Sequence, residues 1–483
     1  MAEVDAVVVG AGPNGLAAAV VLARAGLSVR IYERDEAIGG GARTGELTLP
    51  GFLHDICSAV HPLALSSGFF RAFQLARRID LVVPEISYAQ PLDGGRAGIA
   101  WRDLDRTAEA LGVDGPAWRR LLAPLVNRAG EVAQFTGSQV LQLPRHPTTV
   151  ARLGLRILEQ GSGVAWDRRF TTEEAPALLT GVLAHSSQRL PSLASAAGGL
   201  VLATSAHSRG WPIPIGGSGS IVEAMAADIR LHGGEIITGT EVGSVSELPE
   251  ARAILFDLTP RALARIAADR LPERYRRALD RFRYGNGVAK VDFALSEPVP
   301  WRNPELAAAG TLHLGGTRDE MVASEKEVAN GRHPGSPYVL VAQPSAFDST
   351  RAPADKHVLW SYTHVPNGSI RDRTEAITAQ IERFAPGFRD TILASASRTA
   401  IDVERHNPNY VGGDIAGGAM SLAQLIARPV LSPVPWRTPT EGLYLCSSST
   451  PPGPGVHGLA GYYAAVTAMK DRFGISHAPN LGI

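Results

Sequence analysis

The sequence predicts an α/β fold in which helices cover a parallel sheet, together with a second part of mixed α+β structure. Three observations lead to this prediction. An apolar strand near the N-terminus runs into a glycine-rich turn and an alanine-rich helix, an order typical of parallel sheets. Residues 106–135 carry apolar side chains at helical spacing. Residues 288–386 alternate between strand-like and helix-like segments, which indicates a second sheet with its own helices.

The first apolar strand, Ala6–Val9, begins a dinucleotide-binding fingerprint. It is followed by the sequence GAGPNG, by a helix and by a second strand that ends on Glu33. In this pattern Gly10 makes the tight turn, Gly12 lets the backbone approach a pyrophosphate, and Gly15 allows the helix to pack closely on the strand. The N–H groups at the helix start attract phosphate, and the acidic residue accepts hydrogen bonds from a ribose. The residues expected to contact the dinucleotide here are Gly10, Gly12, Pro13, Asn14, Gly15, Glu33 and Arg34.

The stretch after Glu33 favours FAD over NAD as the dinucleotide. A nicotinamide-binding fold normally continues into an ordinary helix, whereas this chain continues into Gly39, Gly40 and Gly41. Glycines let the backbone fold back over the phosphates and ribityl chain of a longer cofactor. Arg43 follows them and can form charge-assisted bonds to a phosphate. A flexible surface loop is the alternative interpretation of these glycines.

Four motifs together resemble a known family. They are ERDEAIGGGART at 33–44, PGFLHDICSAVHP at 50–62, a Gly-Gly turn, helix and strand at 213–242, and GLYLCSSSTPPGPGVHGLAGYYAA at 442–465. The set resembles the two-dinucleotide-binding-domain flavoproteins of the amine oxidase superfamily. Within them it is most similar to the phytoene desaturase-like branch, which contains carotenoid desaturases and retinol saturases. These motifs identify fold and cofactor better than they identify a substrate.

The resemblance implies a Rossmann-type FAD-binding domain built from discontinuous segments. Residues 1–70, 208–262 and 428–483 would form this domain, and residues 71–207 and 263–427 would form an inserted α+β substrate domain with a mixed or antiparallel sheet. In the resembled fold the last strand leads into a Ser/Pro/Gly run along the ribityl chain, and the final helix points its N–H groups at the flavin. Further cofactor contacts are therefore expected at Ser58, Val242, Ser447, Ser448, Gly455, Val456, His457 and Gly458.

The chain departs from the family pattern in two places, and a second glycine motif lacks the features of a dinucleotide site. A short link joins Val242 to the expected strand at 252–260, where the family has a longer β-meander, so the adenosine end of the site should be more open. Ser447 stands where relatives usually carry glycine, and its hydroxyl can hydrogen-bond the cofactor. A second glycine motif at 216–219 has no acidic residue at the required distance, so we expect no separate NAD(P)H-binding domain.

Two histidines are candidates for catalysis. His61 lies in the loop expected to pass the flavin ring, where it can orient substrate or move a proton. A loop histidine with satisfied hydrogen bonds is the alternative. His457 lies at the start of the final helix, where we expect contact with flavin or substrate. Cys57 and Cys446 both fall near the expected cofactor site, and a buried inert thiol is the default interpretation of each.

Aromatic and polar residues in the second part of the chain are candidates for binding substrate. Trp360, Tyr362 and His364 alternate along one strand and therefore share a face, which is either a pocket wall or ordinary core. Tyr410 and Asp414 lie in a Gly-rich turn that leads back to the FAD-binding domain and should line the pocket. Capping of that turn is the other role open to Asp414.

Composition limits the partners and the cellular location. Lys and Arg number 47, as do Asp and Glu, so net charge gives no reason to expect a nucleic-acid partner. The two cysteines cannot make a disulfide framework, which favours a cytoplasmic location. The apolar N-terminus is interrupted by Gly, Pro and Asn, so we expect neither a signal peptide nor a membrane span. Peripheral contact with a membrane is compatible with an apolar substrate. No metal-ligand spacing is present, and no oligomeric state is indicated.

The leading hypothesis is an FAD-dependent enzyme that transfers hydride between a carbon–carbon bond of a small apolar substrate and flavin N5. The substrate would be isoprenoid-like, lipid-like or cyclic, and oxygen, a quinone or another protein would reoxidise the flavin. One alternative is a flavin amine oxidase, for which Lys290 is a candidate active-site lysine. The other alternative is a redox-neutral isomerase that uses reduced FAD.

Overall fold

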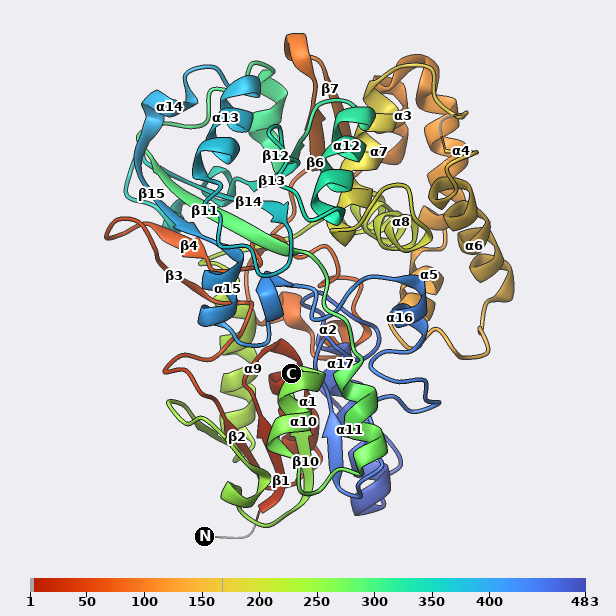
Figure 1. Cartoon of the computed structure of the whole chain (residues 1–483), viewed down its shortest axis with the longest axis vertical. Helices are drawn as coiled ribbons and strands as arrows, with labels where there is room; N and C mark the ends of the chain where they lie inside the picture. Colours follow the sequence, from red (N-terminus) through yellow and green to blue (C-terminus); the bar gives the residue numbers. More distant parts are fainter. Residues whose placement is uncertain (1–3, 167) are drawn as a thin grey trace.

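A parallel sheet of five strands forms the lower half of the molecule in Figure 1. The computed structural model describes residues 4–166 and 168–483, so the first three residues of the segment predicted at 1–70 lie outside the described residues. The strand order is β16-β10-β1-β2-β9, with β1 at the centre. The strands are β16 (Leu443–Leu445), β10 (Ala251–Phe256), β1 (Val4–Val9), β2 (Val29–Tyr32) and β9 (Glu235–Ile237).

Helices cover both faces of the parallel sheet. Ala6 and Val8 of β1 belong to a core that contains residues of α1, α9 and α17, whereas Val7 and Val9 belong to a core with residues of α10 and α11. A strand that is buried on both faces needs a continuous apolar run, which is why residues 6–9 are all apolar. These helices are α1 (Pro13–Arg24), α9 (Gly219–Leu231), α17 (Leu459–Ala468), α10 (Pro260–Ile266) and α11 (Glu273–Asp280).

A mixed sheet of seven strands lies in the upper half of Figure 1. The order is β15-β11-β14-β13-β12-β6-β7, and every neighbouring pair is antiparallel except β6 with β12. One face packs against α13 (Thr374–Phe384) through residues such as Phe293 and Leu312. The strands are β15 (Ile392–Arg398), β11 (Gly287–Leu295), β14 (His357–Val365), β13 (Val339–Ala342), β12 (Ala309–Leu314), β6 (Ile86–Pro91) and β7 (Ala97–Trp101).

The other face of the mixed sheet is covered by a group of helices beside it (Figure 1). Tyr88, Trp360 and Tyr362 extend from this face into a core shared with the helices. The helices are α3 (Leu104–Ala110), α4 (Gly115–Val126), α5 (Ala129–Thr136), α6 (Pro147–Gly161), α7 (Glu174–Leu183), α8 (Leu193–Ser208) and α12 (Arg318–Ala329). Short elements complete the fold: β3 (Thr44–Glu46), β4 (Leu53–Asp55), β5 (Leu81–Val82), β8 (Ile213–Pro214), α2 (Gly68–Ala72), α14 (Phe388–Thr391), α15 (Ala400–His406) and α16 (Leu422–Ile426).

The predicted α/β fold is confirmed, with a parallel sheet and a mixed sheet, and local boundaries differ. The strand expected at 252–260 ends at Phe256, because Pro260 begins α10 and Thr259 caps that helix. The helical stretch at 106–135 is divided into three helices, and Gly112, with φ +54°, separates the first two. Among the described residues, no helix combines the length and apolar character needed to cross a membrane.

Candidate active site

A cavity of about 610 Å³ connects the two sheets. One end is lined by residues that follow the strands of the parallel sheet, including Gly10, Glu33 and Asp257. The other end is lined by Thr311 and Trp360 of the mixed sheet and by residues of α5 and α8. Open parallel sheets bind ligands at the carboxyl ends of their strands. One continuous cavity can therefore hold a nucleotide against the first sheet and a reacting molecule against the second.

The glycines of the fingerprint leave no room for side chains. A Cβ on Gly15 would lie 2.1 Å from the backbone oxygen of Gly10, and a Cβ on Gly12 would lie 2.5 Å from Oδ2 of Asp257. Gly10 has φ +99°, a value that side chains disfavour. Gly12 is also the N-cap of α1, so the positive end of this helix faces the cavity. These constraints produce the cradle that a pyrophosphate requires.

Glu33 is fixed by the backbone at the end of β2. Its Oε2 accepts a hydrogen bond of 2.8 Å from the N–H of Ala11, and its Oε1 accepts one of 3.0 Å from the N–H of Asp35. Nη1 of Arg43 donates to Asp35 at 2.7 Å, and Arg34 pairs with the same carboxylate at 3.1 Å. Arg43, predicted to bind a phosphate, and Arg34, predicted to contact the dinucleotide, therefore share their positive charge with Asp35.

Gly41, in the second group of glycines, packs against Tyr410. A Cβ on Gly41 would lie 2.1 Å from the Tyr410 hydroxyl, while Gly39 and Gly40 adopt φ +114° and +52°. Burial raises the pKa of the Tyr410 hydroxyl well above its usual value. The hydroxyl therefore stays protonated beside Gly41, and both residues line the cavity.

Asp257 is a cavity residue that the sequence analysis did not identify. It follows β10, and its Oδ2 accepts a hydrogen bond of 2.9 Å from the N–H of Gly15. Burial raises its pKa to about 7, and the negative charge of Glu33 contributes in the same direction. A polar residue at the end of an apolar strand is the one sequence signal for it. Its carboxyl group lies at the positive end of α1, where the phosphate of a dinucleotide is expected.

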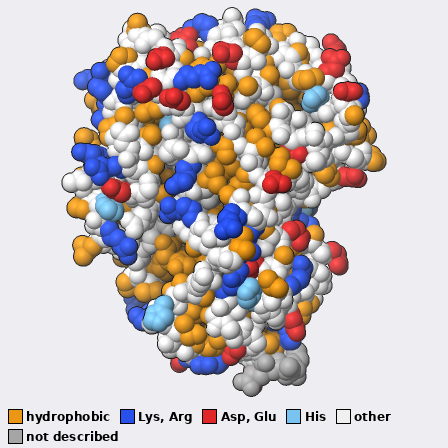
Figure 2. Space-filling model, turned by 180° about the vertical axis from the view of Figure 1, so that it is seen from behind, with side chains coloured by type: hydrophobic (Ala, Val, Ile, Leu, Met, Phe, Trp, Pro, Cys, Tyr) orange, Lys and Arg blue, Asp and Glu red, His pale blue; other side chains and the backbone are white. Residues whose placement is uncertain are grey.

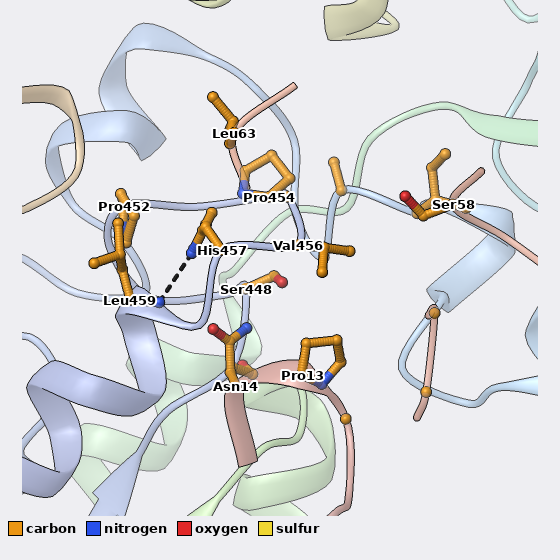
Figure 3. A pocket seen from close by; sticks show the side chains of 18 of the residues that line it. Pro13, Asn14, Ser58, Leu63, Ser448, Pro452, Pro454, Val456, His457 and Leu459 are labelled. Carbon is orange, nitrogen blue, oxygen red and sulfur yellow. Dashed lines mark hydrogen bonds between the residues drawn. The ribbon is translucent and has the colours of Figure 1, made fainter. Parts of the chain in front are cut away.

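The C-terminal loop is held in place by His457 (Figure 3). Its Nδ1 accepts a hydrogen bond of 3.0 Å from the N–H of Leu459, and its Nε2 donates to the backbone oxygen of Gly453 at 3.1 Å. Burial lowers the pKa of His457 to about 4, so the ring is neutral. Ser448 and Val456 lie in the same pocket as Pro13, across from the start of α1. Both nitrogens of His457 are thus used to shape the loop that enters α17.

His61 joins a buried polar network. Its Nε2 lies 2.8 Å from the hydroxyl of Ser218, whose backbone N–H donates to Asp55 at 2.8 Å. Asp55 in turn pairs with Arg351 at 2.6 Å, and the side chains of both are fully buried. Burial lowers the pKa of His61 to about 4. The ring is therefore a neutral part of the cavity wall whose Nε2 is already engaged.

Aromatic side chains form the wall on the mixed sheet. Trp360 and Tyr362 pack edge to face with ring centroids 5.2 Å apart, and both line the cavity. Lys290 lies behind them, with its ammonium nitrogen 5.5 Å from the Trp360 ring centroid and paired with Asp292. Burial lowers the pKa of Lys290. A second cavity of about 20 Å³, lined in part by Lys290 and Cys57, adjoins this wall.

Most of the residues predicted from sequence meet in the main cavity. Those that line it are Gly10, Gly12, Pro13, Asn14, Glu33, Arg34, Gly40, Gly41, Arg43, Ser58, His61, Val242, Trp360, Tyr362, Tyr410, Ser447, Ser448, Gly455, Val456 and His457. Gly15, Gly39 and Gly458 are outside this lining and shape the turns instead, with Gly458 as the N-cap of α17.

His364 and Asp414 also lie outside the cavity lining. His364 stacks on Tyr338 with centroids 5.2 Å apart, and its Nδ1 lies 2.9 Å from Glu325. Asp414 accepts backbone hydrogen bonds from Gly285, Ala416 and Gly418, which is the capping role left open by the sequence. Cys57 and Cys446 are both free thiols.

Residues 14–465 match the family described as flavin containing amine oxidoreductase. The chain belongs to this family. The match spans nearly the whole cavity, from the first helix of the fingerprint to α17. FAD is therefore the cofactor, and the glycine cradle, Glu33 and the loop before α17 are the groups that fit it. The chain is an FAD-dependent oxidoreductase.

Two relatives of known sequence match over almost their full length. The rat pyridine nucleotide-disulfide oxidoreductase domain-containing protein 2 is 27% identical over 563 residues, which cover 97% of this chain and 94% of the rat protein. An uncharacterised protein of Mycobacterium tuberculosis is 26% identical over 544 residues, which cover 97% of both chains. The similarity therefore covers nearly the whole chain in both an animal protein and a bacterial protein.

Solved structures share the fold at low sequence identity. Putrescine oxidase bound to putrescine has a TM-score of 0.59 at 18% identity, over 97% of this chain and 99% of that chain. Cyclohexylamine oxidase from Brevibacterium oxydans has a TM-score of 0.57 at 15% identity, over 97% and 99%. A putative protoporphyrinogen oxidase from Exiguobacterium has a TM-score of 0.52 at 16% identity, over 98% of this chain and 100% of that chain. These likenesses support the fold.

Proposed function

We propose that this family member transfers hydride between a carbon–carbon bond of an apolar substrate and the flavin, as in phytoene desaturase-like enzymes. The observation that carries the proposal is the distribution of charge in the cavity. The acidic residues in its lining all lie at the parallel sheet, where we expect the nucleotide, and they are Glu33, Asp35, Glu241 and Asp257. Among the described residues, the end beside the mixed sheet has no acidic lining residue.

An apolar substrate suits this end of the cavity better than a cation does. Trp211, Leu340 and Trp360 line it and are buried. Covering apolar surface stabilises a complex by about 25 cal/mol per Å². A protonated amine would lose its hydration there without gaining a carboxylate partner, which costs several kcal/mol.

The protein's own residues would hold the substrate and exclude water. FAD supplies the hydride acceptor when it is bound. Trp360 and Tyr362 present their rings to the substrate, and the neutral His61 and His457 keep the adjoining loops in place. Desaturation would send a hydride from one carbon to the flavin and release a proton from the neighbouring carbon to solvent. When the C–H bond is activated, this places little demand on a strong base.

Amine oxidation is the second candidate because of Lys290. This lysine is buried beside Trp360 at the cavity wall, in a family that contains amine oxidases. Its pairing with Asp292 neutralises its charge. The pair therefore does not supply the unpaired carboxylate that would attract an amine cation.

The partners and location remain part of the proposal. Oxygen, a quinone or another protein would reoxidise the flavin, and the free thiols favour the cytoplasm. Figure 2 shows a face on which hydrophobic side chains lie beside Lys and Arg through the middle of the molecule. Such a surface is compatible with peripheral contact with a membrane.

Anaerobic mixing of the holoenzyme with a substrate panel tests the proposal. The panel contains polyenes, cyclic ketones and primary or secondary amines, and the absorbance of oxidised flavin is followed by stopped flow. We expect bleaching by a polyene or a cyclic ketone. Bleaching by amines alone would establish amine oxidation instead. Conversion of a polyene only after prior reduction, with the flavin left reduced, would establish the isomerase.

A further inference from the structure

Two histidines meet at the substrate end of the cavity. His185, in the turn after α7, lines the cavity, and its Nε2 lies 2.7 Å from Nε2 of the buried His313 on β12. Their rings are nearly perpendicular, with centroids 4.9 Å apart. Trp211 packs edge-on against His185 at 5.7 Å, and Tyr88 stacks on Trp211 at 4.9 Å. The orientation of the pair is therefore fixed by aromatic packing.

Both rings are neutral, so one proton is shared in the contact between them. Burial lowers the pKa of His185 to about 3 and lowers that of His313 well below its usual value. A hydrogen bond between two neutral imidazoles requires that one Nε2 carries a proton and the other accepts it. The tautomer of His313 therefore decides which nitrogen of His185 is free of a proton.

The position of Gln90 favours one tautomer of His313. The Nε2 of Gln90 donates to the backbone oxygen of Gly316 at 2.9 Å, which fixes its amide so that Oε1 points the other way. That Oε1 and the Nδ1 of His313 are both buried without a hydrogen-bond partner in the described part of the chain. Both atoms border the same small space beside Gly181. Oε1 of Gln90 lies 2.6 Å, and Nδ1 of His313 lies 2.7 Å, from the point that a Cβ on Gly181 would occupy. A proton on Nδ1 of His313 is attracted electrostatically by this nearby acceptor even without a hydrogen bond between the two atoms, whereas the lone pair of a bare nitrogen would be repelled by it.

The proton on Nδ1 of His313 has a consequence for the cavity. Nε2 of His313 must then accept the proton of Nε2 in His185, which leaves Nδ1 of His185 without a proton. No hydrogen bond occupies Nδ1 of His185 among residues 4–166 and 168–483. Thr311 also lines the cavity, two residues before His313 on β12, and its buried hydroxyl has no partner in the same ranges.

We infer that His185 is a hydrogen-bond acceptor for the hydroxyl group of an otherwise apolar substrate, with His313 and Gln90 as positioning residues. This inference rests on the proposed function and names the substrate class, an apolar alcohol. A bare ring nitrogen accepts the hydroxyl proton. A carbonyl or ether oxygen offers no proton to His185. An ammonium group finds no carboxylate among the described residues that line this end of the cavity.

The tautomer is tested by ¹⁵N NMR of holoenzyme labelled only in histidine. Comparison with His185→Phe assigns the His185 signals, and we expect a bare Nδ1 and a protonated Nε2. In Gln90→Leu, which removes the free acceptor, the proton should move so that Nδ1 of His185 becomes protonated. A protonated Nδ1 in the wild type, or an unchanged spectrum in Gln90→Leu, would overturn the assignment. A purely structural Gln90 would leave the tautomer of a folded variant unaltered.

Binding of matched probes tests the hydroxyl class without turnover. Calorimetry on oxidised holoenzyme would compare farnesol, its methyl ether and farnesylamine, and likewise cyclohexanol with its methyl ether. We expect an alcohol to bind about fivefold more tightly than its ether, the size of one neutral hydrogen bond, and this preference to disappear in His185→Phe. If no alcohol binds more tightly than its ether, or if farnesylamine binds best, the inference is wrong.

The two tests separate this inference from the proposed function. The NMR and calorimetry involve no redox step, so their results stand whatever the enzyme oxidises. Bleaching of the flavin by a polyene or ketone would stand even if His185 carried its proton on Nδ1.

Discussion

The ionisation of Asp257 should control how tightly the apoprotein binds FAD. Its Oδ2 lies 2.9 Å from the N–H of Gly15 and 2.5 Å from the point that a Cβ on Gly12 would occupy. The carboxyl group therefore contacts the turn that a pyrophosphate approaches. Burial, with a contribution from Glu33, raises its pKa to about 7. A second negative charge from the diphosphate would favour the protonated form further.

The direction and size of the effect follow from this pKa. Because folding raises its pKa, Asp257 keeps its proton to a higher pH in the folded protein than in the unfolded chain. The contribution of this protonation to the free energy of unfolding is lost as pH rises through about 7. If FAD binds the protonated form, its apparent Kd is the intrinsic Kd divided by the protonated fraction. That fraction falls about tenfold between pH 6 and pH 8, so the apparent Kd should rise about tenfold.

Quenching of FAD fluorescence on titration with apoprotein measures this Kd across the pH range. Asp257→Asn keeps an acceptor for the N–H of Gly15 but cannot ionise, so its Kd should be nearly independent of pH. Glu241→Gln removes another acidic residue of the cavity lining and should retain the wild-type pH profile. Equal pH dependence in the wild type and Asp257→Asn would refute the argument.

Four further outcomes are expected. Gly15→Ala should abolish FAD binding, because its Cβ would lie 2.1 Å from a backbone oxygen, whereas Gly154→Ala in α6 meets open space and should bind FAD normally in the same titration. Arg351→Met leaves Asp55 buried without its ionic partner and should lower the free energy of unfolding by about 3–5 kcal/mol in urea, with a smaller loss for Arg351→Lys. His457→Ala should slow anaerobic flavin reduction by about 10–100-fold, and a much larger loss would indicate obligatory proton transfer. Stopped-flow mixing with NADH or NADPH should give little flavin reduction, and rapid saturable reduction by either would contradict the expectation of a non-nicotinamide electron acceptor.

The cofactor end of the site was predictable because its requirements are local in the sequence. A strand, three glycines, a helix and Glu33 occupy consecutive positions, and each has a steric or electrostatic reason to be there. The contact of Asp257 with Gly15 joins residues 242 positions apart, which spacing cannot reveal. The polar residue after an apolar strand was visible, but its place beneath the fingerprint depends on the strand order β10-β1.

Strand periodicity predicted which side chains share a face but not what covers that face. Trp360, Tyr362 and His364 do lie on one side of β14. The first two line the cavity, whereas His364 is covered by Tyr338 and bonded to Glu325. The residues that cover His364 come from other elements. Glu325 lies on α12, and Tyr338 lies directly before β13, so neither belongs to the strand whose periodicity was analysed. Periodicity alone therefore overestimated the extent of the pocket.

Buried charges explain how distant segments build one cavity. Arg351 pairs with Asp55 at 2.6 Å and links the mixed-sheet region to the loop that carries His61. Arg428 donates to the backbone oxygens of Ala416 and Ser448 at 2.8 and 2.9 Å, and burial lowers its pKa to about 10. A buried guanidinium is costly unless its N–H groups are engaged, so each arginine favours the arrangement in which its partners are in place. The wall shared by FAD and substrate is thus specified by long-range polar contacts, and its shape depends on these arginines as much as on the fingerprint.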